Sequence, residues 1–178
     1  MNALYILIAA LGGYLLGSIP FGLVITNLAG LGDIRAIGSG NIGFFLGTTA
    51  GLVAGAAAFA GHCFPVWLNF KGGKGVATFV GTVLVVAWPV GLAVIASWLI
   101  TAAIFRISSL GALVGALAAP VAALVIGRAD VAIMTGLLAV MIFWLHRANI
   151  GRILKGEEPR IGGGKKAQAD GESKADET

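Results

Sequence analysis

Long apolar segments, separated by short polar loops, make up most of this chain. The segments are residues 3–26, 42–68, 76–105, 109–127 and 131–145. No side chain is charged between residues 36 and 70 or between residues 75 and 105. Because an apolar run of about 18 residues or more can cross a bilayer as a helix, the pattern predicts an all-α, polytopic bundle of transmembrane helices.

Prolines interrupt the apolar segments and predict short, broken helices. Pro20 lies near the end of the first segment, where we expect a kink or a broken helix end. Residues 76–105 are too long for one straight span, so we expect two short spans that turn at Pro89. The expected total is about six spans. Ser18 either faces a polar cleft or bonds back to its own helix, and the second arrangement is the commoner one.

The composition supports the membrane class. Of the 178 residues, 58% are hydrophobic and 11% are charged, and the mean hydropathy is +0.95. Soluble domains carry about 25% charged residues. The chain has 28 glycines, which suits close helix–helix approach in lipid. Cys63 is the single cysteine, so no internal disulfide is possible.

The distribution of charge predicts the orientation in the membrane. Seven of the twelve basic residues follow His146, where they mark the cytoplasmic side, so the net charge of +4 does not indicate nucleic-acid binding. The first apolar run is too long for a cleaved signal peptide and lacks a basic region before it. We expect a membrane domain over residues 1–161 and a disordered polar tail over residues 162–178.

The loop Phe70–Gly75 carries two lysines among three glycines. Glycines let successive backbone amides converge, and lysines add point charges beside them, which suits a phosphate. A lone basic loop more often only sets the topology, but the three flanking glycines are more than such a loop needs, so phosphate binding is favoured here. A nucleotide-binding Walker A motif is disfavoured, because neither Lys71 nor Lys74 is followed by Ser or Thr.

The first polar loop, Asp33–Gly43, also contains glycines in a G-x-G-x-x-G spacing. A dinucleotide site would need a preceding strand and a carboxylate about 20 residues later, and residues 36–70 contain no carboxylate. What remains is a second glycine-rich loop with Ser39 and Asn41 as hydrogen-bond donors to an anion. His62 is a functional candidate because it lies in an apolar segment, and a structural hydrogen bond is about equally common there.

The basic tail opens with a polar motif. If the last helix continues, His146, Asn149 and Ile153 share one face, while Arg147 points elsewhere.

Five motifs together resemble one family. They are Gly17–Gly22, Gly38–Gly43, Gly61–Trp67, Phe70–Thr78 and His146–Ile150, in that order. The set is similar to the bacterial acyl-phosphate:glycerol-3-phosphate acyltransferases, the PlsY family. The resemblance implies a seven-span inner-membrane enzyme that moves a fatty acyl group from acyl phosphate to glycerol 3-phosphate. The products are lysophosphatidic acid and phosphate, and neither coenzyme A nor an acyl carrier protein is the direct donor.

The resemblance also implies a site on the cytoplasmic side. The residues expected to act in catalysis are Ser39, Lys74, His146 and Asn149. Those expected to bind substrate or phosphate are Gly38, Gly40, Asn41, Gly72, Gly73, Gly75 and His62. The proton acceptor is either His146 or a substrate phosphate. No metal and no cofactor are expected. The expected partners are the two substrates, membrane lipid and the enzyme that makes acyl phosphate, with no nucleic acid.

One departure from the family pattern is visible. The family motif continues with Thr, Asn, Arg and Lys residues, whereas Phe44-Phe45-Leu46-Gly47 follow Gly43 here. We therefore expect a missing span and loop. Residues 42–68 suffice for one span only, yet placing Arg35 and Lys74 on the same side requires an even number of crossings. Two alternatives stay open: a truncated and impaired family member, or a small transporter with broken helices.

Overall fold

A computed structural model of the chain describes residues 3–19 and 48–162. These residues form seven α-helices and one short 3-10 helix, so the prediction of an all-α protein is confirmed. The elements are α1 (Ala3–Ser18), α3 (Thr48–Cys63), η1 (Val66–Leu68), α4 (Val76–Val86), α5 (Trp88–Phe105), α6 (Ser108–Val125), α7 (Ala129–Leu145) and α8 (Arg147–Leu154). The first break at Pro20 and the tail after Gly162 lie outside the described residues.

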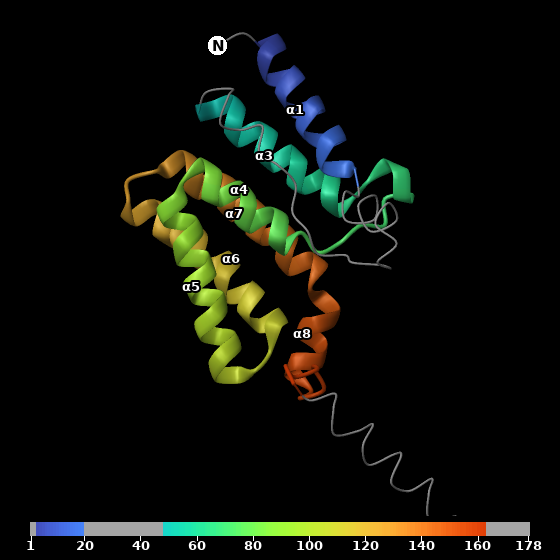
Figure 1. Ribbon diagram of the computed structural model, residues 1–178, viewed down its shortest axis with the longest axis vertical. Coiled ribbons are helices and arrows are strands. Elements are labelled where there is room, and N and C mark those ends of the chain that lie inside the picture. Colours follow the sequence, from blue (N-terminus) through green and yellow to red (C-terminus); the bar gives the residue numbers. More distant parts are fainter. Residues whose placement is uncertain (1–2, 20–47, 163–178) are drawn as a thin grey trace, which may run out of the picture.

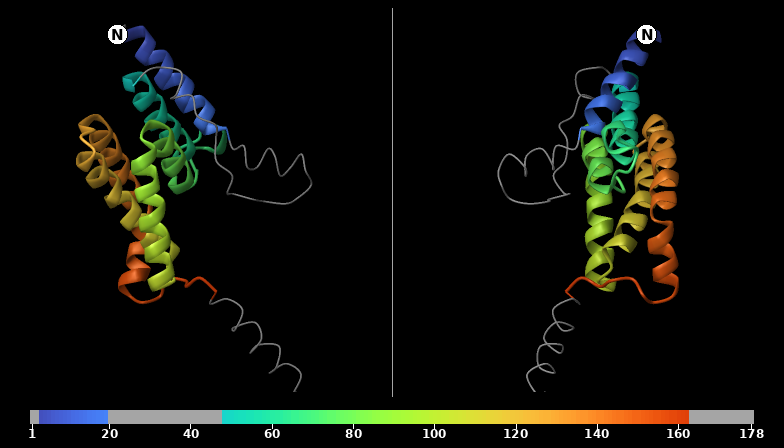
Figure 2. Two further views of the ribbon diagram at one scale, coloured as in Figure 1. Left: turned by 60° about the vertical axis from the view of Figure 1, so that its left-hand side comes forward. Right: turned by 90° about the vertical axis from the view of Figure 1, so that its right-hand side faces the viewer.

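The helices form two adjoining groups (Figure 1). α1 packs along α3, and α5, α6 and α7 pack in sequence with α4 against α5 (Figure 2). α3 joins the two groups through its contacts with α4 and α7. α8 continues from the end of α7 and contacts α6. This arrangement brings the start of α4 to the same region as the junction of α7 and α8.

The breaks between helices follow the predicted pattern with small shifts. The segment 76–105 divides at Ala87, whose backbone leaves the helical region at φ −155° and ψ 82°. Pro89 lies in the first turn of α5, where its missing N–H costs no hydrogen bond. The helix after α7 bends by 63° at His146. The expected face shared by His146 and Asn149 is therefore built across a bend rather than along one straight helix.

Apolar helices account for most of the described chain. Among residues 3–19 and 48–162, three helices are long and apolar enough to cross a membrane, or four if α7 and α8 count as one bent span. Two shorter apolar helices, Ile6–Ser18 and Val76–Val86, accompany them. The two short helices and the bent pair of α7 and α8 agree with the prediction of a helix bundle that contains short, broken helices. The large apolar side chains on the outside, such as those of α5, then face lipid instead of water.

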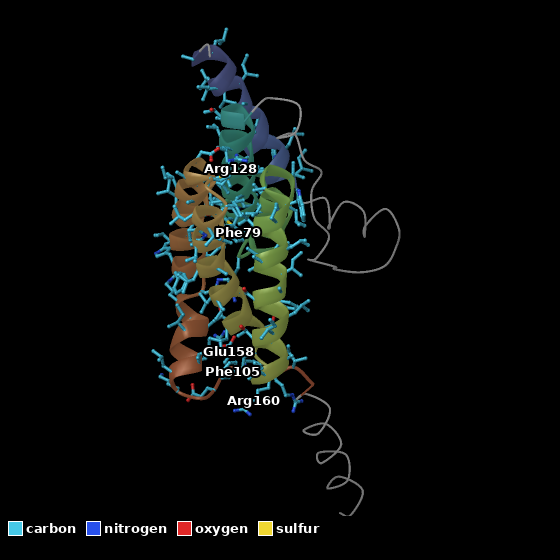
Figure 3. All side chains as sticks on the ribbon, turned by 90° about the vertical axis from the view of Figure 1, so that its left-hand side faces the viewer. Phe79, Phe105, Arg128, Glu158 and Arg160 are labelled. Atoms are coloured by element: carbon cyan, nitrogen blue, oxygen red, sulfur yellow. The ribbon has the colours of Figure 1, made fainter. Side chains whose placement is uncertain are left out.

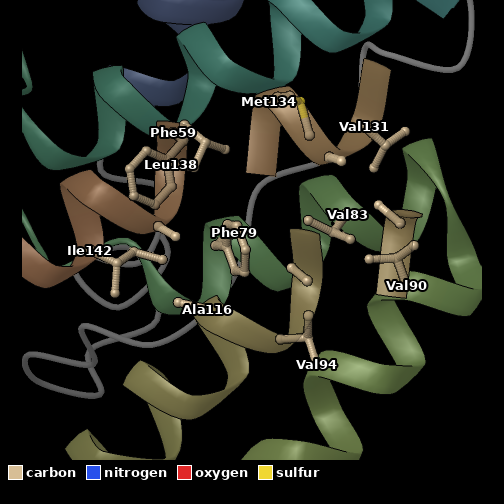
Figure 4. Packing of buried hydrophobic residues seen from close by; sticks show 14 of the residues in the cluster. Phe59, Phe79, Val83, Val90, Val94, Ala116, Val131, Met134, Leu138 and Ile142 are labelled. Atoms are coloured by element: carbon tan, nitrogen blue, oxygen red, sulfur yellow. The ribbon is translucent and has the colours of Figure 1, made fainter. Parts of the chain in front are cut away.

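The core lies where α3, α4, α5, α6 and α7 meet (Figure 4). Phe59 and Phe79 are fully buried there and meet edge to face, with ring centroids 6.4 Å apart. Phe79 stands one turn into α4, and Ile142 lies one turn before the end of α7. The core thereby fixes the two helix ends from which polar residues extend.

Small residues let α1 approach α3 closely. A Cβ atom added at Gly13 would lie 2.4 Å from Ala54 O, and one at Gly17 would lie 2.2 Å from Ala58 O. Backbones that touch in this way are typical of small-residue helix interfaces in membranes. Ser18 Oγ donates to Tyr14 O at 2.8 Å, so the commoner of its two predicted arrangements is confirmed.

Candidate active site

The glycine-rich loop lies against the end of α3. Gly72 N donates to Cys63 O at 3.2 Å, and a Cβ atom at Gly72 would lie 2.2 Å from His62 O. Gly75 has a positive φ of 75°, and a Cβ atom there would lie 2.3 Å from the Phe59 ring. Both positions therefore require glycine for steric reasons. The Gly72 amide is already occupied and is not free for a ligand.

The same loop leaves the start of α4 open. Gly75 is the N-cap residue of α4 and supplies no side-chain cap. Within the part of the chain that the structure describes, no hydrogen bond uses the amides of Gly73, Lys74 or Gly75. Free amides just before a helix start lie beside the positive end of the helix dipole, which is favourable for an anion. The His62 ring lies beneath Gly73, where an added Cβ atom would be 2.8 Å from Nε2.

Lys74 reaches from this loop to α8. Its Nζ donates to Asn149 Oδ1 at 2.5 Å, although 75 positions separate the two residues in the chain. Lys74 is exposed, whereas Asn149 is only 5% exposed. Asn149 Nδ2 in turn donates to Glu158 Oε1 at 2.6 Å. An ammonium only donates and a carboxylate only accepts, so the amide of Asn149 has one possible orientation between them.

Glu158 is the centre of a buried polar cluster. Besides Asn149, its carboxylate accepts hydrogen bonds from Ser109 Oγ at 2.5 Å and from Arg152 Nε at 2.7 Å. Burial raises the pKa of Glu158, but the hydrogen bonds from Ser109, Asn149 and Arg152 outweigh it and lower the pKa from 4.5 to about 2. Glu158 is therefore ionised at neutral pH and fixes Asn149 as an acceptor for Lys74.

His146 occupies the bend between α7 and α8 and is 2% exposed. Its Nδ1 lies 2.8 Å from Ile142 O, and because a carbonyl only accepts, Nδ1 carries the proton. In the neutral ring Nε2 then presents a lone pair. Arg147 turns the other way, with its guanidinium 4.8 Å from the centroid of the Trp144 ring. The expected separation of Arg147 from the shared face is thus confirmed.

The structure unites some of the predicted residues. Lys74 and Asn149 are in direct contact, and His146 lies one turn before Asn149. Lys71 is exposed and forms no side-chain contact with this cluster. Four predicted residues lie outside the described residues, namely Gly38, Ser39, Gly40 and Asn41.

Glu158 and its partners Ser109 and Arg152 were not predicted from the sequence. A signal was present, since Glu157 and Glu158 are the only carboxylates between residues 131 and 169. Acidic residues inside a basic segment are expected to have a cationic or amide partner nearby. Within residues 3–19 and 48–162, no group of three His, Cys, Asp or Glu side chains could hold a metal ion.

The fold and site define a helical membrane protein with a lysine–amide–carboxylate cluster beside a glycine-rich helix start. A family model described as glycerol-3-phosphate acyltransferase matches residues 7–46 and 44–156. The glycerol-3-phosphate acyltransferase of Maricaulis maris (strain MCS10) is 67% identical over 196 aligned positions, covering 92% of this chain and 91% of the relative. That of Paramagnetospirillum magneticum (strain AMB-1) is 53% identical, covering 92% and 97%.

Solved structures agree with these relatives. The crystal structure of PlsY, an integral membrane glycerol 3-phosphate acyltransferase, in its glycerol 3-phosphate form has a TM-score of 0.73 and 32% identity, covering 88% of this chain and 96% of that one. Its lysophosphatidic acid form has a TM-score of 0.72. The chain belongs to the glycerol-3-phosphate acyltransferase family.

The prediction of a missing span after Gly43 is not supported. The matches cover 91% and 97% of the two relatives' own lengths. The prediction depended on the residues that follow a single motif, and connecting segments vary most within a fold. Family membership also argues against the transporter alternative.

Proposed function

We propose that this chain transfers a fatty acyl group from acyl phosphate to glycerol 3-phosphate, giving lysophosphatidic acid and inorganic phosphate. The observation that carries the proposal is the contact of Lys74 with Asn149 beside the open start of α4. Both substrates are phosphates, and this is a site where a cation and free amides converge. The similar PlsY has been solved in a glycerol 3-phosphate form and a lysophosphatidic acid form.

Lys74 and the loop amides hold phosphate oxygens in this proposal. An ammonium has three donors, so Lys74 can keep its bond to Asn149 while it binds a phosphate. The amides of Gly73 and Gly75 add neutral donors, and the α4 dipole favours the negative charge. Gly72 acts by shaping the loop, since its amide is bonded to Cys63 O. The resemblance adds the first glycine loop, with Gly38, Ser39, Gly40 and Asn41.

The reaction needs no covalent enzyme intermediate. A glycerol hydroxyl oxygen attacks the acyl carbonyl carbon, the bond from that carbon to the phosphate oxygen breaks, and phosphate leaves with the electron pair. The hydroxyl proton passes either to His146 Nε2 or to a substrate phosphate oxygen. Holding two anions side by side and aligning hydroxyl with carbonyl supplies much of the rate. Asn149 and His146 orient the glycerol moiety.

The site faces the cytoplasm of a bacterial inner membrane in this proposal. Glu158 and Arg160 lie at one end of the helix bundle, and Arg128 lies toward the other (Figure 3). The end with Glu158 carries the basic tail, and an excess of basic residues marks the cytoplasmic side. Cys63 is the single cysteine and is 2% exposed. Cys63→Ala gives a cysteine-free protein, into which one cysteine at a time can be introduced for labelling. A Lys155→Cys variant should react from the cytoplasmic side, and an Asp130→Cys variant from the periplasmic side.

The donor is tested with purified protein in detergent. Acyl phosphate with glycerol 3-phosphate should yield lysophosphatidic acid by mass spectrometry, whereas acyl-coenzyme A should yield none. The Lys74→Ala protein, purified identically, should form product at least about tenfold more slowly, whereas a contaminating enzyme would give equal rates in the two preparations. Turnover with acyl-coenzyme A alone would contradict the assignment of the donor.

A further inference from the structure

We infer that Arg106 is a positioning residue that sets the geometry of Asn149 through the chain segment 157–161. Arg106 lies at the turn between α5 and α6, and its side chain bonds to the main chain of this segment rather than to Asn149. The inference depends on the proposed function only for the identity of the substrate, glycerol 3-phosphate.

Arg106 and Ile161 hold one another through three hydrogen bonds. Arg106 Nε and Nη2 both donate to Ile161 O, at 3.1 and 2.7 Å. In return Ile161 N donates to Arg106 O at 2.6 Å. Arg106 has a left-handed backbone conformation with φ 59°, which is uncommon for a residue with a side chain. The turn is thus built so that one residue presents both its carbonyl and its guanidinium to Ile161.

We call the three hydrogen bonds between Arg106 and Ile161 the clasp. The clasp lies next to the polar cluster around Glu158 in the chain. Glu158 stands three residues before Ile161, and Ser109 stands three residues after Arg106. Ser109, in the first turn of α6, donates from Oγ to Glu158 Oε1, so the turn at Arg106 and the start of α6 hold the segment at two points. Figure 3 places Glu158 and Arg160 at the same end of the bundle as Phe105, which precedes Arg106.

The clasp acts on the site through fixed hydrogen bonds. With Ile161 held, the Glu158 carboxylate stays where it accepts from Asn149 Nδ2, and Asn149 Oδ1 then faces Lys74. If the segment moves away, Asn149 loses the acceptor that defines the orientation of its amide. The amide can then turn its NH2 group toward Lys74, which replaces an acceptor by a second donor.

The guanidinium is essential to this role. A basic residue that only marks the cytoplasmic side can be Arg or Lys with equal effect. Two parallel N–H groups directed at one carbonyl require the planar fork of arginine. Arg106→Lys therefore separates the two roles, because it keeps the charge and removes the fork.

The experiment compares Arg106→Gln and Arg106→Lys with wild type in detergent. The control is Arg160→Gln, which removes a charge from the exposed neighbour of Ile161. We measure the Kd for glycerol 3-phosphate without donor, KM and kcat with acyl phosphate, Tm, and amide hydrogen exchange over residues 157–162. Both Arg106 variants should raise Kd and KM about tenfold and speed exchange in this segment, with Tm close to wild type. Arg160→Gln should match wild type.

Three results would overturn the inference. The first is a wild-type Kd in Arg106→Gln, and the second is full activity in Arg106→Lys. The third is a lower Tm in either Arg106 variant with unchanged Kd and KM, which would mark Arg106 as a purely structural residue. The Kd is measured without turnover, so it judges the clasp even if the donor is misassigned. Failure of the wild type to make product would instead count against the proposed function alone.

A second pair of variants tests the clasp from its other side. Ile161→Pro removes the N–H that Arg106 O accepts, whereas Ile161→Ala keeps the whole backbone. Ile161→Pro should reproduce the change in Kd seen in Arg106→Gln, and Ile161→Ala should not. Equal Kd values for the two Ile161 variants would contradict the clasp.

Discussion

Lys74 Nζ and Asn149 Oδ1 lie 2.5 Å apart, and Asn149 is the only side chain in the described part of the chain that Lys74 contacts by a hydrogen bond. The contact joins the start of α4 to α8, and it continues through Asn149 Nδ2 to the carboxylate of Glu158. A cation, an amide and an anion are thus connected in series. The buried carboxylate of Glu158 thereby stabilises the orientation in which Asn149 accepts a hydrogen bond from Lys74.

Replacing Lys74 tests the cation directly. In the proposed site, Lys74→Ala removes a charge-assisted hydrogen bond to substrate phosphate. Such a bond contributes about 1.5–3 kcal/mol, so the single-turnover rate should fall by about 10- to 100-fold. Lys71→Ala is the matched control, because Lys71 belongs to the same loop and is exposed. Equal rates for the two variants would remove Lys74 from the site.

Exchanging charge between Asn149 and Glu158 tests their hydrogen bond. Asn149→Asp places a second carboxylate against Glu158 and should lower kcat/KM by at least about tenfold. Adding Glu158→Gln restores the hydrogen bond with its direction reversed, because the amide at position 158 then donates to the carboxylate at position 149. The double variant should therefore be more active than Asn149→Asp alone. A double variant as weak as the product of the two single effects would show that the residues are energetically independent.

Two adjacent glycines in α1 test the close packing on α3. Gly13→Ala forces a Cβ atom against Ala54 O and should lower the free energy of unfolding by about 1–3 kcal/mol. Nothing lies within 4 Å of a Cβ atom at Gly12, so Gly12→Ala should be neutral or stabilising by up to about 1 kcal/mol. Thermal unfolding in one detergent measures both. A similar Tm for the two variants would contradict the close approach of α1.

The lowered pKa of Glu158 predicts an acid-sensitive C-terminal segment. The folded protein holds the pKa of Glu158 at about 2, below the ordinary value of 4.5. A depressed pKa stabilises the fold fully above about pH 4.5, and this stabilisation is lost as the pH falls toward 2. Pepsin should therefore begin to cleave within residues 154–162 across this interval.

Two variants calibrate the acid experiment. Glu158→Gln lacks the titrating group and should be cleaved already at pH 4.5. Glu157→Gln changes the exposed neighbour and should follow the wild-type profile. Cleavage of the wild type that does not change between pH 4.5 and 2 would show that Glu158 does not hold this segment.

The apolar pattern was sufficient to predict the helices. Residues 109–127 were predicted as a span and form α6 over Ser108–Val125, because an apolar helix in lipid must satisfy its own backbone. The break before Pro89 followed from the geometry of proline, and the structure moved it only to Ala87. The motif order also led to the correct family. Local chemistry repeats in related chains and can be recognised without coordinates.

The sequence alone determined the membrane class, the helix positions and the individual residues Lys74, His146 and Asn149 as candidates. Tertiary structure decided which of them meet: Lys74 contacts Asn149, while Lys71 stays outside the cluster. It also showed two contacts that were not predicted: Glu158 with Asn149, 9 positions away, and Arg106 with Ile161, 55 positions away. The physical reason is that hydrogen bonds between distant residues depend on helix packing and on one bend of 63°, and no local pattern encodes either.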